Sequence, residues 1–278
     1  MQLQINTISD LLDRSFKEDF GTKGDITSHA TIDRHEKVSF AINARQPLIL
    51  CGSQIAEYYF DKYSSIDYQI HFDDSDSISE STSIITGHGF AREVLLLERI
   101  VLNYLQHLSA IATTTNQFVK LAQGTKARIC DTRKTTPTLR SLEKYAVTCG
   151  GGFNHRLTLD SSILIKDNHI AICGSIKEAL ERAKLAAPHY TKIEIECDTI
   201  MQVEEAVRCG ADIIMLDNMS VEEIRESVEI IGNNAVIECS GNISLDTVEE
   251  IAGIGVDIIS VGRITHSAKS VDIGLDIV

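Results

Sequence analysis

Short runs of β-branched and aliphatic residues alternate with helix-like segments in the C-terminal half of this 278-residue chain. The runs are ARICDT, ILIKDN, KIEIEC, DIIMLDN, AVIECS and DIISVG. Because consecutive parallel strands need a helical crossover, this alternation is typical of a parallel sheet. Later strand ends recur at a nearly constant interval. They fall at Glu196, Asp217, Ser240 and Gly262. Repeating βα units of one length predict a (β/α) barrel of eight strands or fewer.

A doubly wound sheet would alternate in the same way, so glycine motifs decide between the two folds. Dinucleotide-binding sheets carry GxGxxG after a strand, and P-loop proteins carry GxxxxGK[ST]. Neither motif follows any of the six runs. We therefore expect an α/β barrel over residues 111–278.

Residues 1–110 have a different pattern. They combine a short amphipathic helix, the turn-rich segment EDFGTKGDITS and the strand-like runs VSFAINA and PLILCG. This mixture predicts a separate α+β domain with long loops. The C-terminal residues 267–278 are expected to return and pack on it.

The strongest predicted helix covers residues 90–108, FAREVLLLERIVLNYLQHL. Four polar residues share one stripe of it, at helical spacing. They are Arg92, Arg99, Asn103 and Gln106. Either this stripe faces solvent, or Arg99 projects from it into a ligand site.

Composition limits the partners. The net charge of −14 argues against nucleic acid and anionic membranes, because both require extended basic surfaces. Small molecules are the expected partners. The seven cysteines never form CxxC, which favours free, mostly buried thiols in a reducing compartment. The N-terminus lacks a signal-peptide pattern, and no apolar run approaches the roughly 20 residues of a membrane span. We expect a cytoplasmic protein.

Basic residues gather in residues 131–169, against the acidic balance of the whole chain. They are Arg133, Lys134, Arg140, His155, Arg156, Lys166 and His169. Carboxylates also follow or line the predicted strands, including Glu194, Glu196 and Asp217. One such aspartate often only caps the next helix, but the whole set is harder to explain in that way. Barrels bind ligands where their strands end, so the set predicts a site for an anion.

The last two strands lead into CSGNIS and SVGRITHS. Small residues before a helix let backbone N–H groups approach an anion, and many barrels bind a phosphate there. A glycine turn explains either motif alone, but the pair favours a phosphate site. Glu196 and Asp217 lie on adjacent strands, where Mg²⁺ shared with phosphates would compensate their charge. His155 and His169 lack the spacing of a zinc site.

The motifs resemble the quinolinate phosphoribosyltransferase family over almost the whole chain. They are DTRKTTPTLR, GGGFNHR, ILIKDNH, IEIECDT, IIMLDN, IECSGNIS and VGRITHS, with EDFGTKGDITS and LLLERIVLNYLQHLSAIAT in the first domain. The resemblance implies a type II phosphoribosyltransferase with an N-terminal open-faced α/β sandwich, an incomplete α/β barrel, and a homodimer whose active sites are shared. The type I acidic-pair motif is absent.

The resemblance also implies residue roles. The two carboxylates of quinolinate are held by Arg133, His155, Arg156 and Lys166, with Arg99 contributed by the second subunit. Phosphoribosyl diphosphate contacts Lys134, Glu196, Asp217, Ser240, Gly241, Asn242, Gly262 and His266. The residues closest to the chemistry are Lys134, Lys166, Glu196 and Asp217, and the last two also bind Mg²⁺, directly or through water.

The implied reaction joins the pyridine nitrogen of quinolinate to C1 of phosphoribosyl diphosphate. Diphosphate and CO₂ leave, and nicotinate mononucleotide forms for NAD biosynthesis. Two residues depart from the family pattern, which has glycine where Thr138 and Ala110 stand. If that glycine needs φ > 0, Thr138 is strained there, and we expect a modest change in the loop.

Three alternatives remain open. A phosphoribosyltransferase of the same fold could use another acceptor, although the intact set of cations favours a dicarboxylate. Lys166 ends a strand and could serve a Schiff-base aldolase. A non-catalytic nucleotide-binding protein is the third, and Lys134, Glu196 and Asp217 argue against it.

Overall fold

The computed structural model describes residues 3–278, which form two compact units. The first unit contains the residues up to Asn116 together with Thr136–Gly151 and Ser267–Val278. The second contains Gln117–Thr135 and Gly152–His266. The contacts thus divide the chain within a long helix and place two later segments in the first unit. The sequence analysis set the boundary near residue 110 and expected one of these segments, residues 267–278, to pack on the first domain, but not Thr136–Gly151.

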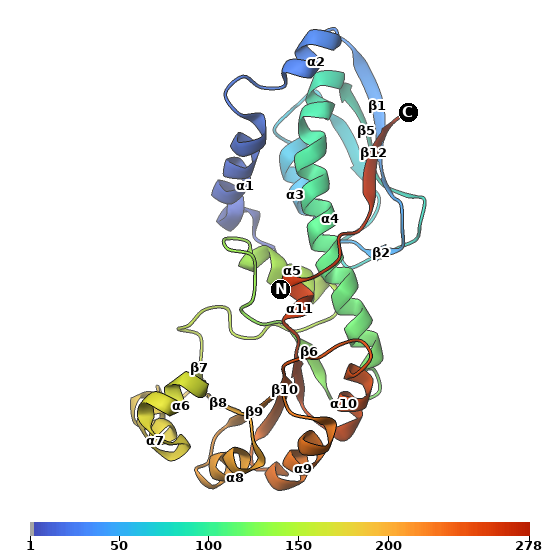
Figure 1. The fold of residues 1–278 in the computed structure, drawn as a ribbon. Coiled ribbons are helices and arrows are strands. Elements are labelled where there is room, and N and C mark those ends of the chain that lie inside the picture. Colours follow the sequence, from blue (N-terminus) through green and yellow to red (C-terminus); the bar gives the residue numbers. More distant parts are fainter. Residues whose placement is uncertain (1–2) are drawn as a thin grey trace. The chain divides into compact units, whose positions relative to one another are not determined.

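The first unit is built around a four-stranded antiparallel sheet (Figure 1). Its strands, in spatial order, are β12 (Ile273–Ile277), β1 (Lys37–Ala44), β5 (Thr82–Phe90) and β3 (Asp67–Ile70). A two-stranded sheet pairs β2 (Leu48–Ile49) with β4 (Ser77–Ile78). The C-terminal strand β12 therefore completes the sheet of the first unit by pairing with β1.

Five helices accompany these strands. They are α1 (Ile5–Phe20), α2 (Ile26–Thr31), α3 (Ser53–Phe60), α4 (Ala91–Leu121) and α5 (Arg140–Cys149). Phe60 of α3 packs on Phe40 of β1 with ring centroids 5.7 Å apart, and both are buried. Gln106 of α4 donates a hydrogen bond to the carbonyl of Ile273, at 2.7 Å. Helix and sheet thus share one apolar core.

Helix α4 is longer than the predicted segment 90–108. It is the one described helix whose length and apolar composition would suit a membrane span, but 61% of its most apolar window is buried inside the protein. Such burial is typical of a core helix. On its polar stripe, Arg92 donates to the carbonyl of Ile32, and Arg99 is exposed.

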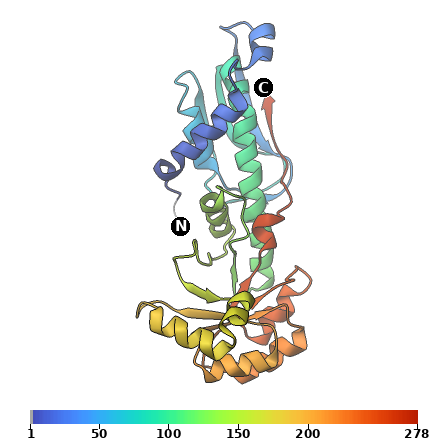
Figure 2. The same ribbon diagram turned by 60° about the vertical axis from the view of Figure 1, so that its left-hand side comes forward.

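The second unit is an open barrel of six parallel strands (Figure 2). Its strands are β6 (Arg128–Cys130), β7 (Ile163–Ile165), β8 (Ile193–Cys197), β9 (Ile213–Asp217), β10 (Val236–Ser240) and β11 (Ile258–Ser260). The spatial order is β6-β11-β10-β9-β8-β7, so β6 and β7 are edges that do not pair with each other. The predicted α/β fold with an incomplete barrel is confirmed.

Helices follow the strands of this unit, as the repeating pattern predicted. They are α6 (Asp167–Cys173), α7 (Ile176–Ala186), α8 (Ile200–Arg208), α9 (Val221–Ile231), α10 (Val248–Ile254) and α11 (Arg263–His266). Capping boxes define two starts: Thr199 with Gln202 at α8, and Ser220 with Glu223 at α9. These caps end each loop a few residues after its strand, which keeps the strand ends close to the helix starts.

All seven cysteines are free, and five of them are buried. The sequence prediction of free, mostly buried thiols is confirmed.

Candidate active site

A cavity of about 380 Å³ opens at the carboxyl ends of the barrel strands. Its lining residues are Thr132, Arg133, Lys134, His155, Arg156, Leu164, Lys166, Glu196, Met215, Asp217, Glu238, Ser240 and Ser260. Eight of these were predicted from the sequence as site residues: Arg133, Lys134, His155, Arg156, Lys166, Glu196, Asp217 and Ser240. The structure therefore brings most of the predicted set into one cavity.

Strand register explains why these side chains face the same space. Glu196 of β8 pairs with Met215 of β9, which pairs with Glu238 of β10. One layer further along, Asp217 pairs with Ser240, which pairs with Ser260. Because side chains alternate along a strand, residues two apart share a face. The cavity is thus lined by two successive layers of inward-facing residues.

Glu238 and Ser260 were not predicted as site residues. A signal was present, because Glu238 lies two residues before Ser240, which the sequence placed in the site, and so shares its face. Leu164 and Met215 also line the cavity, but apolar residues within a strand are usually core residues. The sequence alone gave no reason to separate them from the core.

Two arginines, Arg133 and Arg156, line this cavity. Burial lowers the pKa of Arg156, and the nearby positive charge of Arg133 lowers it further. Arg156 also donates from Nη1 to the carbonyl of Ser162, at 2.9 Å, which fixes the guanidinium. The positive charges of these two guanidinium groups repel each other, so an anion bound between them would stabilise both. The forked N–H donors of a guanidinium also match the two oxygens of a carboxylate.

Lys166 also lines the cavity, and its ammonium pairs with the carboxylate of Glu196. Burial raises the pKa of Glu196, and Lys166 opposes that shift while Asp217 adds to it. Carboxylate oxygens of Glu196, Asp198 and Asp217 all lie within 4.8 Å of one another. This all-oxygen donor set fits Mg²⁺, which prefers carboxylates and water. Asp198 was missed because it follows the strand in the helix-start motif CDT.

His155 lines the same cavity as the two arginines, with only 12% of its side chain exposed. Its Nε2 is 3.3 Å from Oε2 of Glu194 and 3.4 Å from Oε1 of Glu238. Burial opposes the charge, but these two carboxylates raise the pKa of His155 to about 10. Burial also disfavours the charged form of Glu194 and raises its pKa, and the hydrogen bond with His155 opposes that shift.

One contact of His155 favours the neutral ring instead: the backbone N–H of Arg156 points at Nδ1, 2.7 Å away. The two carboxylates favour the imidazolium, whereas burial and this contact at Nδ1 oppose it. From the two carboxylates we infer that His155 is a cation.

The predicted phosphate-binding residues follow β10 and β11. Gly241 has φ +85°, and a Cβ built on it would lie 2.3 Å from Oδ1 of Asn218, so this position needs glycine. Asn242 donates to the same oxygen, at 3.0 Å. A Cβ on Gly262 would lie 3.1 Å from Cδ of Lys134 and 3.4 Å from Cδ2 of His266. Lys134 and His266 thus converge on Gly262.

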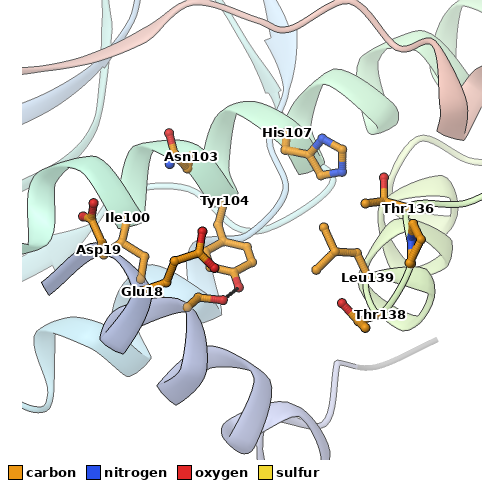
Figure 3. A pocket seen from close by; sticks show the side chains of 11 residues that line it. Glu18, Asp19, Ile100, Asn103, Tyr104, His107, Thr136, Thr138 and Leu139 are labelled. Carbon is orange, nitrogen blue, oxygen red and sulfur yellow. Dashed lines mark hydrogen bonds between the residues drawn. The ribbon is translucent and has the colours of Figure 1, made fainter. Parts of the chain in front are cut away.

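Arg99 is exposed on α4 in the first unit and does not line this cavity. That unit has its own cavity of about 550 Å³, shown in Figure 3. It is lined by Ser15, Glu18, Asp19, Ile100, Asn103, Tyr104, His107, Thr136, Pro137, Thr138 and Leu139. Although larger, it lacks a cluster of cations, since His107 is its only basic lining residue and hydrogen-bonds to Glu143, at 3.0 Å. Its lining does not predict an anion site.

Thr138 adopts φ +71°, in the left-handed region that disfavours β-branched residues. The prediction that a residue at this family glycine position would be strained is therefore confirmed. Glu143 fixes this loop by accepting the backbone N–H of Thr136, at 3.1 Å. Ala110, the second departure, is buried within α4.

The family model of the quinolinate phosphoribosyl transferase C-terminal domain matches residues 111–276, and that of the N-terminal domain matches residues 25–109. The chain is 43% identical to a probable carboxylating nicotinate-nucleotide pyrophosphorylase of Bacillus subtilis, covering 96% of this chain and 92% of that protein. It is 37% identical to the carboxylating nicotinate-nucleotide pyrophosphorylase of Mycobacterium leprae, covering 99% and 98%.

Solved structures agree. The crystal structure of nicotinate-nucleotide pyrophosphorylase from Ehrlichia chaffeensis superposes with a TM-score of 0.95 at 44% identity, covering all of both chains. The enzyme of that name from Francisella tularensis gives 0.92 at 36% identity, covering 100% of this chain and 98% of that one. On this likeness over the full chain, the protein belongs to the quinolinate phosphoribosyltransferase family.

Proposed function

We propose that this protein is a carboxylating nicotinate-nucleotide pyrophosphorylase, which converts quinolinate and phosphoribosyl diphosphate into nicotinate mononucleotide, diphosphate and CO₂ in NAD biosynthesis. The observation that carries the proposal is the cavity at the barrel mouth, where Arg133, Arg156 and His155 line one space with Glu196 and Asp217. The cations suit a dicarboxylate, and the two carboxylates suit a ribose with its metal ion.

The cationic side is the acceptor half of the site. Two guanidinium groups bind two carboxylates better than one, and the guanidinium geometry allows bidentate contact. Nicotinate carries only one carboxylate and would form fewer contacts with this set of cations. Such a loss is costly, so the same residues discriminate against nicotinate.

The donor half is formed by Lys134 with the turns after β10 and β11. Lys134 lies beside Gly262 and His266, where a diphosphate or 5-phosphate would meet positive charge at a glycine turn that leads into a helix. Ser240, Gly241 and Asn242 form the turn after β10. Glu196 and Asp217 would hold Mg²⁺, which would stabilise the charge of the leaving diphosphate.

Displacement at C1 of ribose develops oxocarbenium character, and carboxylates near the ribose stabilise that charge. The residues mainly hold acceptor nitrogen and ribose carbon in line, which removes much of the entropic barrier. After transfer, the positively charged pyridinium nitrogen can accept the electrons released by decarboxylation. No covalent nucleophile from the chain is required.

We further propose a homodimer in which Arg99 completes the acceptor site of the second subunit. Its exposure on α4 supports this role, because an exposed arginine can reach a partner chain. A cytoplasmic location remains a prediction from the sequence, as does the absence of nucleic-acid and membrane partners.

The aldolase alternative is less favoured by the geometry. A Schiff-base lysine attacks the carbonyl through a free amine, whereas Nζ of Lys166 is paired with the carboxylate of Glu196. Failure of borohydride to trap carbonyl substrates on Lys166 would support the transferase, and a covalent adduct would support the aldolase.

The function is tested by incubating the purified protein with phosphoribosyl diphosphate, Mg²⁺ and either quinolinate or nicotinate, and following nicotinate mononucleotide by mass spectrometry. We expect product from quinolinate alone. Product from nicotinate would contradict the dicarboxylate site. Product from neither, with a folded protein that binds phosphoribosyl diphosphate, would point to another acceptor.

A further inference from the structure

Glu238 of β10 lines the cavity beside His155 and has no part in the reaction described above. Only 2% of its side chain is exposed. Its Oε1 accepts a hydrogen bond from Oγ of Ser260, at 2.5 Å, and lies 3.4 Å from Nε2 of His155. A buried carboxylate that lines a cavity for a dianion requires an explanation, because the two negative charges repel each other.

The groups around His155 come from several elements. Glu194 of β8 and Glu238 of β10 both face Nε2. Asp131, which follows β6, accepts the backbone N–H of His155, at 2.9 Å, and so helps to fix the chain at this residue. The guanidinium groups of Arg133 and Arg156 line the same cavity.

We propose that Glu238 is a positioning residue for the acceptor: together with Glu194, it fixes the imidazole of His155 and keeps it positively charged beneath the bound dicarboxylate. This inference rests on the proposed function. The opposite charge of the imidazolium, 3.4 Å from this carboxylate, would offset the repulsion between Glu238 and the substrate.

The arrangement also limits how His155 can act. Its Nε2 is directed at two carboxylates, and Nδ1 faces the backbone N–H of Arg156. In this arrangement His155 stabilises the dicarboxylate through its charge, whereas the arginines bind it through directed hydrogen bonds. Two adjacent arginines already carry positive charge and disfavour a third cation beside them. The imidazolium form of His155 is therefore stable only because carboxylates lie next to it.

This role predicts a pH dependence with a defined sign. In the wild type the imidazole stays charged up to high pH, because the carboxylates raise the pKa of His155 to about 10. Affinity for the acceptor should therefore not change with pH near neutrality. Without Glu238, the imidazole should titrate closer to its ordinary value of about 6.5 and lose its charge as the pH rises.

The test measures the KM for quinolinate from about pH 6 to about pH 8.5, at saturating phosphoribosyl diphosphate, for the wild type and for Glu238→Gln. Glutamine keeps the volume and can still accept the hydrogen bond from Ser260. We expect a flat KM in the wild type and a rise of about tenfold with pH in the variant, with a smaller change in kcat.

Ser260→Ala is the matched control, because it removes the support of Glu238 but leaves its charge. Its KM should rise modestly and stay flat with pH. Selective ¹⁵N-histidine labelling, with His155→Asn to assign the signal, gives a readout that does not depend on activity. The imidazole of His155 should remain charged at about pH 8 in the wild type and titrate near neutrality in Glu238→Gln.

A KM that is equally independent of pH in wild type and Glu238→Gln would overturn the proposal, as would a neutral His155 in the wild type. A stoichiometric transition metal that is lost in Glu238→Gln would overturn it too, because Glu194, Glu238 and His155 would then be metal ligands. These results require an active wild type. A wild type with no activity on quinolinate would instead contradict the proposed function, and the ¹⁵N titration would still test the charge of His155.

Discussion

The two ends of the six-stranded sheet carry similar residues in different arrangements. The carboxyl end has the cavity of about 380 Å³. The amino end has a larger cavity of about 860 Å³, lined by Lys126, Arg128 and Lys192 among others. At the amino end Lys126 and Lys192 each pair with one aspartate that also holds a strand, whereas at the carboxyl end several cations line the same cavity.

The partners at the amino end show what such residues do when they are structural. Lys192 lies 2.9 Å from Asp212, whose other oxygen accepts the backbone N–H of Ile193 at the start of β8. Lys126 lies 2.7 Å from Asp257, which accepts the N–H of Ile237 in β10 in the same way. Each aspartate holds a neighbouring strand in place. Cavity size is therefore a poorer guide to the site than the convergence of like charges.

The largest expected effect is at the shared site. Lys166→Ala and Arg99→Ala should each be inactive, because each removes a cation from the acceptor site. If Arg99 acts in trans, mixing the two variants should restore one intact site in each heterodimer. Activity of refolded mixtures measures this, with each variant refolded alone as the control. An absence of rescue would remove the shared-site proposal.

Arg133→Ala should lower the affinity for quinolinate by roughly 100-fold, the size expected when a bidentate charged partner is lost. Binding of phosphoribosyl diphosphate should change far less. Calorimetric titration with each substrate separates the two affinities. Equal losses for both would contradict the assignment of Arg133 to the acceptor half.

At the amino end, Asp212→Ala should cost stability and leave KM and kcat unchanged. We expect a loss of about 1–2 kcal/mol, because the N–H of Ile193 and Lys192 both lose their acceptor. Burial alone would raise the pKa of Asp212, but these two partners lower it. The stabilisation should therefore be present above about pH 4 and disappear as the pH falls further. Urea unfolding of the wild type and of Asp212→Ala at several pH values measures this stabilisation. A change in KM would contradict the statement that the amino end is structural and the carboxyl end binds the substrate.

The smallest effect is expected at Thr138, outside both ends. Thr138→Gly should remove the strain of a β-branched residue at φ +71° and stabilise the protein by up to about 1 kcal/mol. Turnover should change little, because the loop is already fixed through Glu143 and Thr136. Thermal unfolding and steady-state rates test both statements, and a large gain in turnover would show that threonine limits catalysis.

The sequence predicted the barrel strands well, because each buried parallel strand is an uninterrupted β-branched run that ends in a polar residue. It predicted most of the site for the same reason: residues after such runs must meet at one edge of the sheet. Glu238 and Ser260 were harder, since a polar residue inside a strand can be either a buried structural group or a lining residue. Only the register with Met215 and Ser240 distinguishes the two cases.

Other features depend on distant contacts that no local pattern encodes. The sequence analysis placed the residues of helix α5 in the barrel domain, but the helix belongs to the first unit. There Tyr145 donates to Asp74, at 2.9 Å, and Glu143 pairs with His107. The protonation of His155 is similar, because it depends on carboxylates 39 and 83 positions away in the chain.

The most direct test of the account is a crystal structure with quinolinate bound. We predict the dicarboxylate at the carboxyl end of the barrel, with its carboxylates on Arg133 and Arg156 and the ring within reach of Lys166. Quinolinate at the amino end of the sheet, or in the cavity between α1 and α4, would contradict the central claim that converging charge at the strand ends defines the acceptor site.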